Sequence, residues 1–283
     1  MNQVSGNAEI FLIHYSNALS TLVTLNSFFR HYPDWHIQVV DNSGGTCSFK
    51  DLVMPHLTGF ADQITLHINP SDEHSPEGDA SHGGGLDFAI ARCTTPYFIM
   101  MESDTFINQR GGFERLLAYM LDGYDWAGFG QKPFGQAFTS FSPAFAIVRC
   151  DLINAYGLSF KRRNRSPDEF DADDPLIKHH LLAAEQARLN LPLTYPEGKP
   201  PNTYKLPREK IISRELAHVR YFDTAEEVHW FLTKKGYRSH LFKPDDSVIH
   251  IWGSRSNELY LEHFAEKLPD VSIEDYLPEG FTP

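Results

Sequence analysis

Two carboxylates stand one residue apart where an apolar segment of the chain ends. Residues 97–104 read YFIMMESD, so Glu102 and Asp104 follow a run of large apolar side chains. Side chains alternate along an extended chain, and both carboxylates would therefore lie on the same side of the strand end. Carboxylate oxygens that converge in this way can bind one hard divalent cation. An isolated acidic pair more often marks only the point where a strand leaves the core. The residues at the neighbouring strand ends must therefore show whether this pair belongs to a binding site.

Polar residues and glycines stand at the other strand ends of the first hundred residues. Asp41 could accept hydrogen bonds from a base or a ribose, and glycines let a backbone approach a ligand closely. Asp41 could equally form a turn before Asn-Ser-Gly, and the glycine run could be a flexible start to a helix. The residues in question are His14, Tyr15, Asp41, Asn42, Gly83, Gly84, Gly85 and Asp87.

An alternation of strands and helices would bring these residues together. Apolar runs predict strands over 8–14, 36–41, 63–69 and 97–102. Helical spacing predicts helices over 16–32, 50–59 and 84–93, with Ser16 able to cap the first. Such a pattern is typical of a parallel sheet with right-handed crossovers, in which ligands bind beyond the carboxyl ends of the strands.

The second half of the chain is less regular. We expect strands over 126–129, 144–149 and 247–252, and helices over 113–121, 174–189, 224–235 and 257–267. Asp174 before Pro175 is a suitable helix start, because Asp caps a helix and Pro fits its first turn. Residues 161–165 form a basic loop, and the Pro-rich stretch 192–208 is expected to be a loop or an extended cover.

Composition excludes several classes of protein. The 283 residues are 41% hydrophobic and contain no apolar run of membrane-spanning length, and the start of the chain lacks a signal-peptide pattern, so we expect a cytoplasmic protein. The net charge of −12 argues against a nucleic-acid partner. Three distant cysteines suggest neither a disulfide framework nor a zinc site. The dinucleotide and P-loop glycine motifs do not occur in the sequence.

The segment IFLIHYSNALSTLVTLNSFFRHYPDWHIQVVDNSGG resembles the opening of a GT-A fold glycosyltransferase of the family 2 type. There, a strand, a helix and a second strand ending in V-D-N-S form the nucleotide pocket. The stretch GGGLDFAIARCTTPYFIMMESD is similar to the family's crossover helix and DxD strand, with Asp87 where Asn is frequent and Glu102 replacing the first Asp. The likeness covers about residues 8 to 108; FAIVRCDLINAYGLSF resembles the acceptor-side strand and helix, and FDADD the E-D motif.

The resemblance implies an α/β fold of GT-A type, with a Rossmann-like, mostly parallel sheet flanked by helices in one continuous domain. Residues 1–108 would bind the nucleotide-sugar, and residues 109–283 would form the acceptor-side half with a closing loop and helices. The implied activity is metal-dependent transfer of a sugar, with inversion of configuration, from a nucleotide-diphosphate sugar. The expected nucleotide is UDP. The acceptor would be a hydroxyl of a glycan or of another molecule.

The resemblance also assigns roles to residues. A chain of net charge −12 would repel a diphosphate unless Mn²⁺ or Mg²⁺ neutralised it, and the implied metal ligands are Asp104, His250 and Glu102. Asp174, with Asp173 beside it, would accept the proton of the acceptor hydroxyl. As alternatives to these functional roles, Asp174 could simply cap a helix, and His250 could be an ordinary residue of the core. The implied donor-binding residues are His14, Tyr15, Asp41, Asn42, Asp87, Glu102, Ser103 and Arg255.

Two other functions are compatible with the residues. The substitution of Glu102 for Asp and the imperfect E-D motif leave open a module of the same fold that binds a nucleotide or a glycan without turnover. A sugar-phosphate nucleotidyltransferase would also use carboxylate-held Mg²⁺. That class needs a basic, Gly-rich loop near the first strand, where this chain has His14, Tyr15, Ser16 and Asn17.

Overall fold

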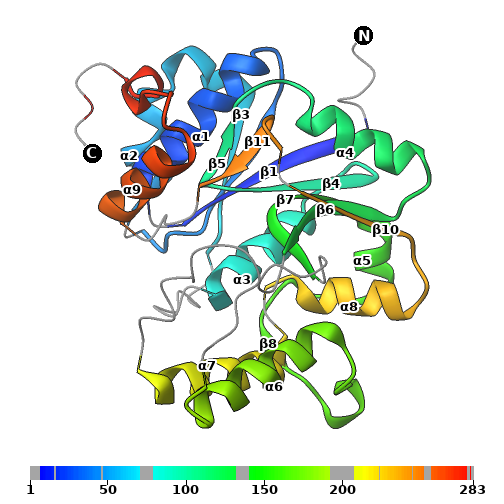
Figure 1. Cartoon of the computed structure of the whole chain (residues 1–283). Coiled ribbons are helices and arrows are strands. Elements are labelled where there is room, and N and C mark those ends of the chain that lie inside the picture. Colours follow the sequence, from blue (N-terminus) through cyan, green and yellow to red (C-terminus); the bar gives the residue numbers. More distant parts are fainter. Residues whose placement is uncertain are drawn as a thin grey trace.

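A seven-stranded sheet forms the centre of the molecule, with the strand order β10-β6-β7-β4-β1-β2-β3 (Figure 1). The strands are β1 (Ala8–His14), β2 (Ile37–Asp41), β3 (Ile64–Ile68), β4 (Tyr97–Glu102), β6 (Trp126–Gln131), β7 (Ser140–Arg149) and β10 (Ser239–Phe242). The computed structural model describes residues 7–15, 17–45, 47–70, 79–131, 140–191, 207–222, 224–243, 245–251, 256–278 and 281.

Six of the seven strands run in the same direction. Strand β1 is parallel to β2 and β4, β2 is parallel to β3, and β10 is parallel to β6. Strand β7 is antiparallel to both of its neighbours, β4 and β6. The predicted α/β class with a mostly parallel, Rossmann-like sheet is therefore confirmed.

Helices cover both faces of the sheet. Along β1, Ile10 and Leu12 pack in the core on the side of α1 and α4, whereas Phe11 and Ile13 pack on the side of α3, α5 and α8. This alternation explains why the strand reads as a continuous apolar run. The helices are α1 (Ala18–His31), α2 (Phe49–Leu52), α3 (Asp79–Ile90), α4 (Gly112–Leu121), α5 (Cys150–Tyr156), α6 (Pro175–Arg188), α7 (Arg208–Arg220), α8 (Glu226–Lys234) and α9 (Asn257–Lys267).

Two small antiparallel pairs complete the fold. Strand β5 (Thr105–Ile107) pairs with β11 (Val248–His250), and β8 (Arg163–Asn164) pairs with β9 (Tyr221–Phe222). Helices α6 and α7 pack against each other at the bottom of the view in Figure 1, joined by a hydrogen bond between His180 and Glu215. No helix among the described residues has the length and apolar composition needed to cross a membrane.

Several local expectations needed correction. Asn17 caps α1, since its side chain accepts a hydrogen bond of 2.9 Å from the N–H of Ser20, while residue 16 lies outside the described residues. The helix expected over 50–59 is instead α2 followed by 3₁₀ turns at Met54–His56 and Thr58–Gln63. Pro55 explains the break, because it has no N–H to continue the helix. Most of the stretch 192–208 lies outside the described residues.

Glycines let α3 pack closely on both sides. A β-carbon at position 83 would lie 2.5 Å from the carbonyl oxygen of Phe160, and one at position 85 would lie 2.8 Å from Cγ2 of Ile13. At position 84 the nearest atom would be Cε of Lys161 at 3.4 Å. Two of the three glycines thus serve contacts within the protein.

Alanine substitutions in this helix should therefore differ sharply. Gly83→Ala forces a β-carbon against backbone and should destabilise the protein by about 1–3 kcal/mol, as overpacking does. Gly84→Ala meets only the end of a flexible side chain, and alanine's helix preference, up to about 1 kcal/mol, should keep stability equal or higher. Urea unfolding of both variants measures the difference. Equal stability would show that α3 does not pack closely on residues 160–161.

Candidate metal centre

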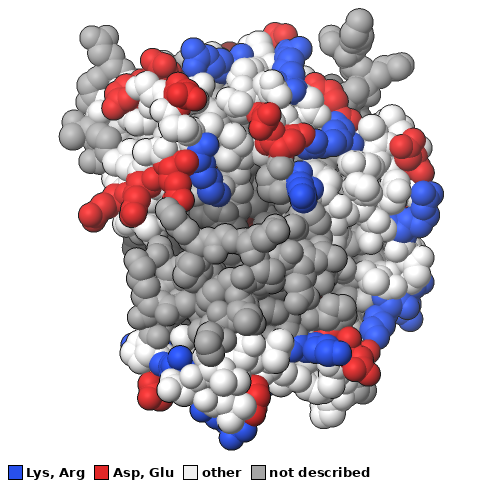
Figure 2. Space-filling view, in the orientation of Figure 1, with Lys and Arg blue, Asp and Glu red and all other residues white. Residues whose placement is uncertain are grey.

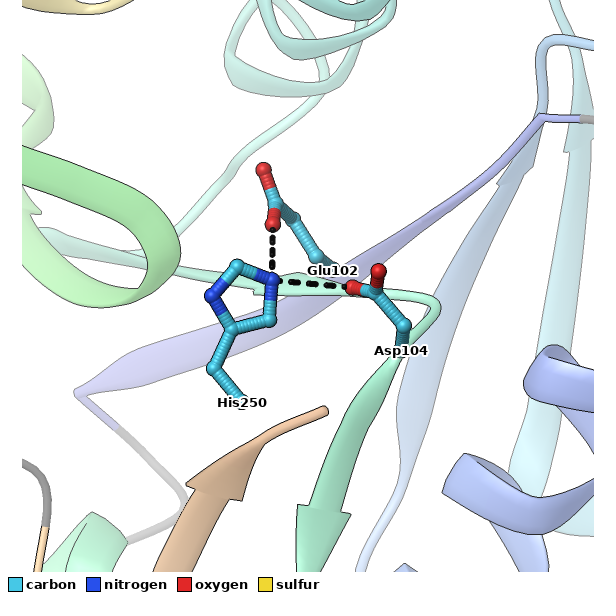
Figure 3. Close-up of side chains that lie close together, drawn as sticks. All are labelled: Glu102, Asp104 and His250. Atoms are coloured by element: carbon cyan, nitrogen blue, oxygen red, sulfur yellow. Dashed lines mark hydrogen bonds and ion pairs between the residues drawn. The ribbon is translucent and has the colours of Figure 1, made fainter. Parts of the chain in front are cut away.

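Glu102, Asp104 and His250 lie together just beyond the end of β4 (Figure 3). The Nε2 atom of His250 is 3.0 Å from Oε2 of Glu102 and 3.2 Å from Oδ1 of Asp104. One ligand atom from each of the three side chains lies within 4.8 Å of the others. Asp104 and His250 are buried, and Glu102 is half-buried. We call these three residues the triad.

Backbone pairing holds the triad in place. Glu102 ends β4, a tight turn follows, and β5 begins at Thr105, which stands opposite His250 in the β5–β11 ladder. The N–H of Ile251 donates a hydrogen bond of 2.9 Å to the carbonyl oxygen of Asp104. The hydroxyl of Thr24, on α1, donates to the carbonyl oxygen of Ser103 at 2.8 Å. The turn is therefore tied to both the C-terminal segment and α1.

The two carboxylates make His250 a cation in the metal-free protein. Burial lowers the pKa of His250, but the charges of Asp104 and Glu102 and their hydrogen bonds outweigh burial and raise it to about 9. At neutral pH a protonated imidazole thus bridges the two acids.

The donor set fits a divalent metal ion. Two carboxylates and one imidazole suit Mn²⁺ and other first-row divalent ions, whereas Mg²⁺ prefers an all-oxygen shell. The hydroxyl of Tyr260 is buried and has no hydrogen-bond partner among the described residues. Burial, and then the charge of Asp104, raise the pKa of this phenol. An unsatisfied hydroxyl in the field of Asp104 is consistent with a site built for a further polar group.

Two residues next to the triad were not assigned a role from the sequence. Nδ1 of His82, on α3, is 3.3 Å from Oε1 of Glu102. The ammonium of Lys267, in the last turn of α9, donates a hydrogen bond to the carbonyl oxygen of His250. Burial lowers the pKa of Lys267 to about 8, and Asp104 opposes this shift. His82 lies in the glycine-rich segment that the sequence singles out, whereas Lys267 carries no local signal.

The predicted residues at the ends of β1 and β2 hold a loop together. The carboxylate of Asp41 accepts hydrogen bonds from the N–H groups of Ser43 at 3.0 Å and Phe49 at 2.8 Å. The imidazole of His14 contacts the Thr21 hydroxyl at 2.8 Å and the Cys47 carbonyl oxygen at 2.6 Å. Asp41 therefore forms the turn after β2, which is the second of the two roles that the sequence allowed for it.

The remaining predicted donor-side residues are spread around the same edge. Oδ1 of Asn42 accepts a hydrogen bond of 2.7 Å from Asn69, and Tyr15 is half-buried directly after β1. Ser103 is buried in the turn between the two acids. Residue Arg255 lies outside the described residues.

Asp87 has a structural role in the fold. Its carboxylate accepts hydrogen bonds from the Ser159 hydroxyl at 2.6 Å and from the Phe160 N–H at 2.7 Å. Burial raises its pKa, and these hydrogen bonds reduce the shift. The side chain thus attaches α3 to the segment that follows α5.

The predicted base lies in a different group of residues. The N–H of Asp174 donates to the carbonyl oxygen of Asp171 at 3.0 Å, and its own carbonyl accepts from Lys178 at 2.9 Å, as expected at a helix start. Asp173 is exposed beside it. The charge of Asp174 acts on Arg165 and on His229, whose pKa burial lowers to about 4. Asp174 therefore interacts electrostatically with Arg165 and His229. The neighbours of the triad are instead His82 and Lys267.

The raised pKa of His250 predicts a pH-dependent stability in the absence of metal. Because the folded pKa of about 9 exceeds the ordinary value of 6.5, the stabilisation is fully present below pH 6.5 and is lost as pH rises to about 9. At about 1.4 kcal/mol per pKa unit, the upper limit is about 3 kcal/mol. Urea unfolding with a chelator should show that His250→Asn removes this loss.

A control variant separates His250 from the other titrating groups. The substitution His36→Asn changes an exposed histidine outside the triad and is the matched control. Lys267 acts in the opposite direction, since its lowered pKa adds stability as pH rises above about 8, but it is common to all three proteins. The interpretation fails if His250→Asn and the unaltered protein have the same pH dependence.

Comparisons with known proteins found similarities to solved structures. No protein-family model matches the sequence, and no curated protein matches it. The chain is similar to the mannosyltransferase PcManGT from Pyrobaculum calidifontis in complex with GDP-Man and Mn²⁺, with 14% identity, 75% of this chain and 69% of that chain covered, and a TM-score of 0.40.

A second similarity is to TarS 1–349 from S. aureus. The identity is 12%, 80% of this chain and 72% of that chain are covered, and the TM-score is 0.42. The complex of TarS 1–349 with UDP has 12% identity, covers 62% of this chain and 54% of that chain, and gives a TM-score of 0.41. A likeness to a glycosyltransferase, which the sequence resemblance implied, is therefore found among solved structures.

Proposed function

We propose that the protein is a metal-dependent glycosyltransferase that moves a sugar from a nucleotide-diphosphate sugar to an acceptor hydroxyl, with inversion at the sugar carbon. The observation that carries the proposal is the position of the triad, just past the carboxyl end of β4 and beside the parallel strands β1 and β2. Sheets of this kind bind their ligands at that edge. The sequence resemblance over residues 8 to 108 supports a nucleotide-sugar as the ligand.

The charges around the triad suit a diphosphate. Glu102, Asp104 and His250 would hold a divalent cation, which would supply the positive charge that a diphosphate needs beside a chain of net charge −12. Lys267, an exposed residue overall, places its ammonium against the backbone of His250. Lys and Arg side chains elsewhere are interspersed with Asp and Glu over the described part of the face in Figure 2. We therefore propose that the triad, with its metal ion, and Lys267 together form the site that binds the anionic diphosphate.

The loop after β2 lies at the same sheet edge. Because the side chains of His14 and Asp41 bond to the backbone of this loop, we propose that they shape it for the nucleotide. The loop backbone would then contact the base and ribose. We retain residues 1–108 as the donor half and residues 109–283 as the acceptor half of the proposed enzyme.

Asp174 is the proposed base for the acceptor hydroxyl, with Asp173 as its neighbour. It stands at the start of α6, half-buried and within the field of Arg165. The carboxylate form of an aspartate is the form that accepts a proton from a hydroxyl.

Asp104→Ala should abolish metal-dependent donor binding. Replacing an outer-shell partner of a metal site costs about 10- to 100-fold in affinity, so removal of a ligand should cost at least about 100-fold. Calorimetry with UDP or GDP, with and without Mn²⁺, measures this effect. Asp62→Ala, at an exposed carboxylate, is the matched control. Unchanged affinity in Asp104→Ala would show that the triad is not the metal site.

Asp174→Asn should separate binding from transfer. Loss of a general base lowers kcat by about 10²- to 10⁴-fold, while the affinity for the donor should stay the same. Asp173→Asn should change kcat only slightly, because its side chain is exposed whereas that of Asp174 is half-buried. Equal kcat values for the two variants would contradict the assignment. Donor binding without hydrolysis or transfer in the unaltered protein would favour the non-catalytic binding module.

A further inference from the structure

Two of the three cysteines lie side by side although 57 positions separate them in the sequence. Cys93 follows α3, and Cys150 is the first residue of α5. Their Sγ atoms are 3.2 Å apart. We propose that Cys93 and Cys150 form an oxidation site, at which a peroxide converts the two thiols into an intramolecular disulfide.

Hydrogen bonds fix the backbone around the pair. The N–H of Cys150 donates a hydrogen bond of 3.0 Å to the carbonyl oxygen of Pro96, and Tyr97 pairs with Arg149 in the sheet. The N–H of Thr94 donates to the carboxylate of Glu9 at 2.6 Å. A disulfide needs an S–S distance of about 2.05 Å, so the sulfur atoms have to approach by only about 1 Å.

The two thiols differ in exposure and in acidity. Cys93 is half-buried, whereas Cys150 is buried. The Cys150 thiol donates a hydrogen bond to Sγ of Cys93, which lowers the pKa of Cys93 and raises the pKa of Cys150. The thiolate is the reactive form of cysteine. Cys93 is therefore the residue that meets the peroxide first, and Cys150 is the residue that completes the bond.

The reaction proceeds in two balanced steps. The Cys93 thiolate attacks one oxygen of hydrogen peroxide, the O–O bond breaks, and hydroxide leaves as Cys93 becomes a sulfenic acid. The sulfur of Cys150 then attacks the sulfur of Cys93, and the S–OH bond breaks as the S–S bond forms. The Cys150 proton leaves with the hydroxyl as water. In total two thiols are oxidised and one peroxide is reduced to two waters.

The site is independent of the triad. Cys93 precedes β4, whereas Glu102 ends it, so the two sites lie at opposite ends of this strand. The disulfide would join the α3–β4 connection to the β7–α5 junction. Binding of Mn²⁺ should therefore be the same in the reduced and the oxidised protein, and either proposal can fail without the other.

The test is peptide mapping of the full chain after treatment with hydrogen peroxide. After alkylation and digestion without reductant, we expect a cross-linked peptide pair that contains Cys93 and Cys150, and dithiothreitol should release it. Cys47 should remain available to alkylation. The oxidised protein should also melt at a higher temperature, because the cross-link restricts the unfolded chain.

Two variants provide controls. Cys47→Ser should form the same cross-link, whereas Cys150→Ser should accumulate a sulfenic acid at Cys93 that dimedone traps. If Cys150→Ser does not fold, the peptide map of the unaltered chain decides alone. The proposal is overturned if Cys93 and Cys150 both remain alkylatable after peroxide, or if the disulfide that forms includes Cys47.

Discussion

The pairing of two acidic side chains with His250 is the interaction on which the arrangement of this fold depends. Asp104 is only 6% exposed, and a buried carboxylate is costly unless an opposite charge or a metal ion lies beside it. The compensating imidazole comes from a residue 146 positions later in the chain. Removing one partner of a buried ion pair typically costs about 3–5 kcal/mol. The C-terminal segment must therefore return to the end of β4 for the sheet edge to be stable.

That return is secured by packing as well as by charge. Strand β11 pairs with β5, and α9 packs Tyr260 and Phe264 against α1 and Phe106 in a core of its own. Lys267, at the end of the same helix, donates its hydrogen bond to the backbone of His250. The apolar contacts thus position the charged groups, and α9 belongs to the candidate site even though it supplies none of the triad.

The sequence predicts much of the sheet and only part of the site. Strands β1 to β4 and helices α1, α4 and α9 follow from local periodicity, since one stretch of chain contains the whole signal. The acidic pair is predictable for the same reason. The contacts of His82 and Lys267 and the proximity of Cys93 to Cys150 depend on distant segments meeting in space. No local sequence pattern predicts such long-range contacts. Helix α7 follows a Pro-rich stretch and has a weak apolar face, so periodicity did not predict it.

If the triad holds a metal ion as proposed, the residue at position 250 must satisfy two opposing demands. Without a metal ion, the acids at 102 and 104 need a positive partner; with one bound, the third side chain must be neutral and offer a lone pair. Arg and Lys satisfy the first demand, yet their retained charge would exclude a cation. An amide carries no charge and would leave the two acids uncompensated. Histidine meets both demands, because its raised pKa keeps the proton until a cation displaces it.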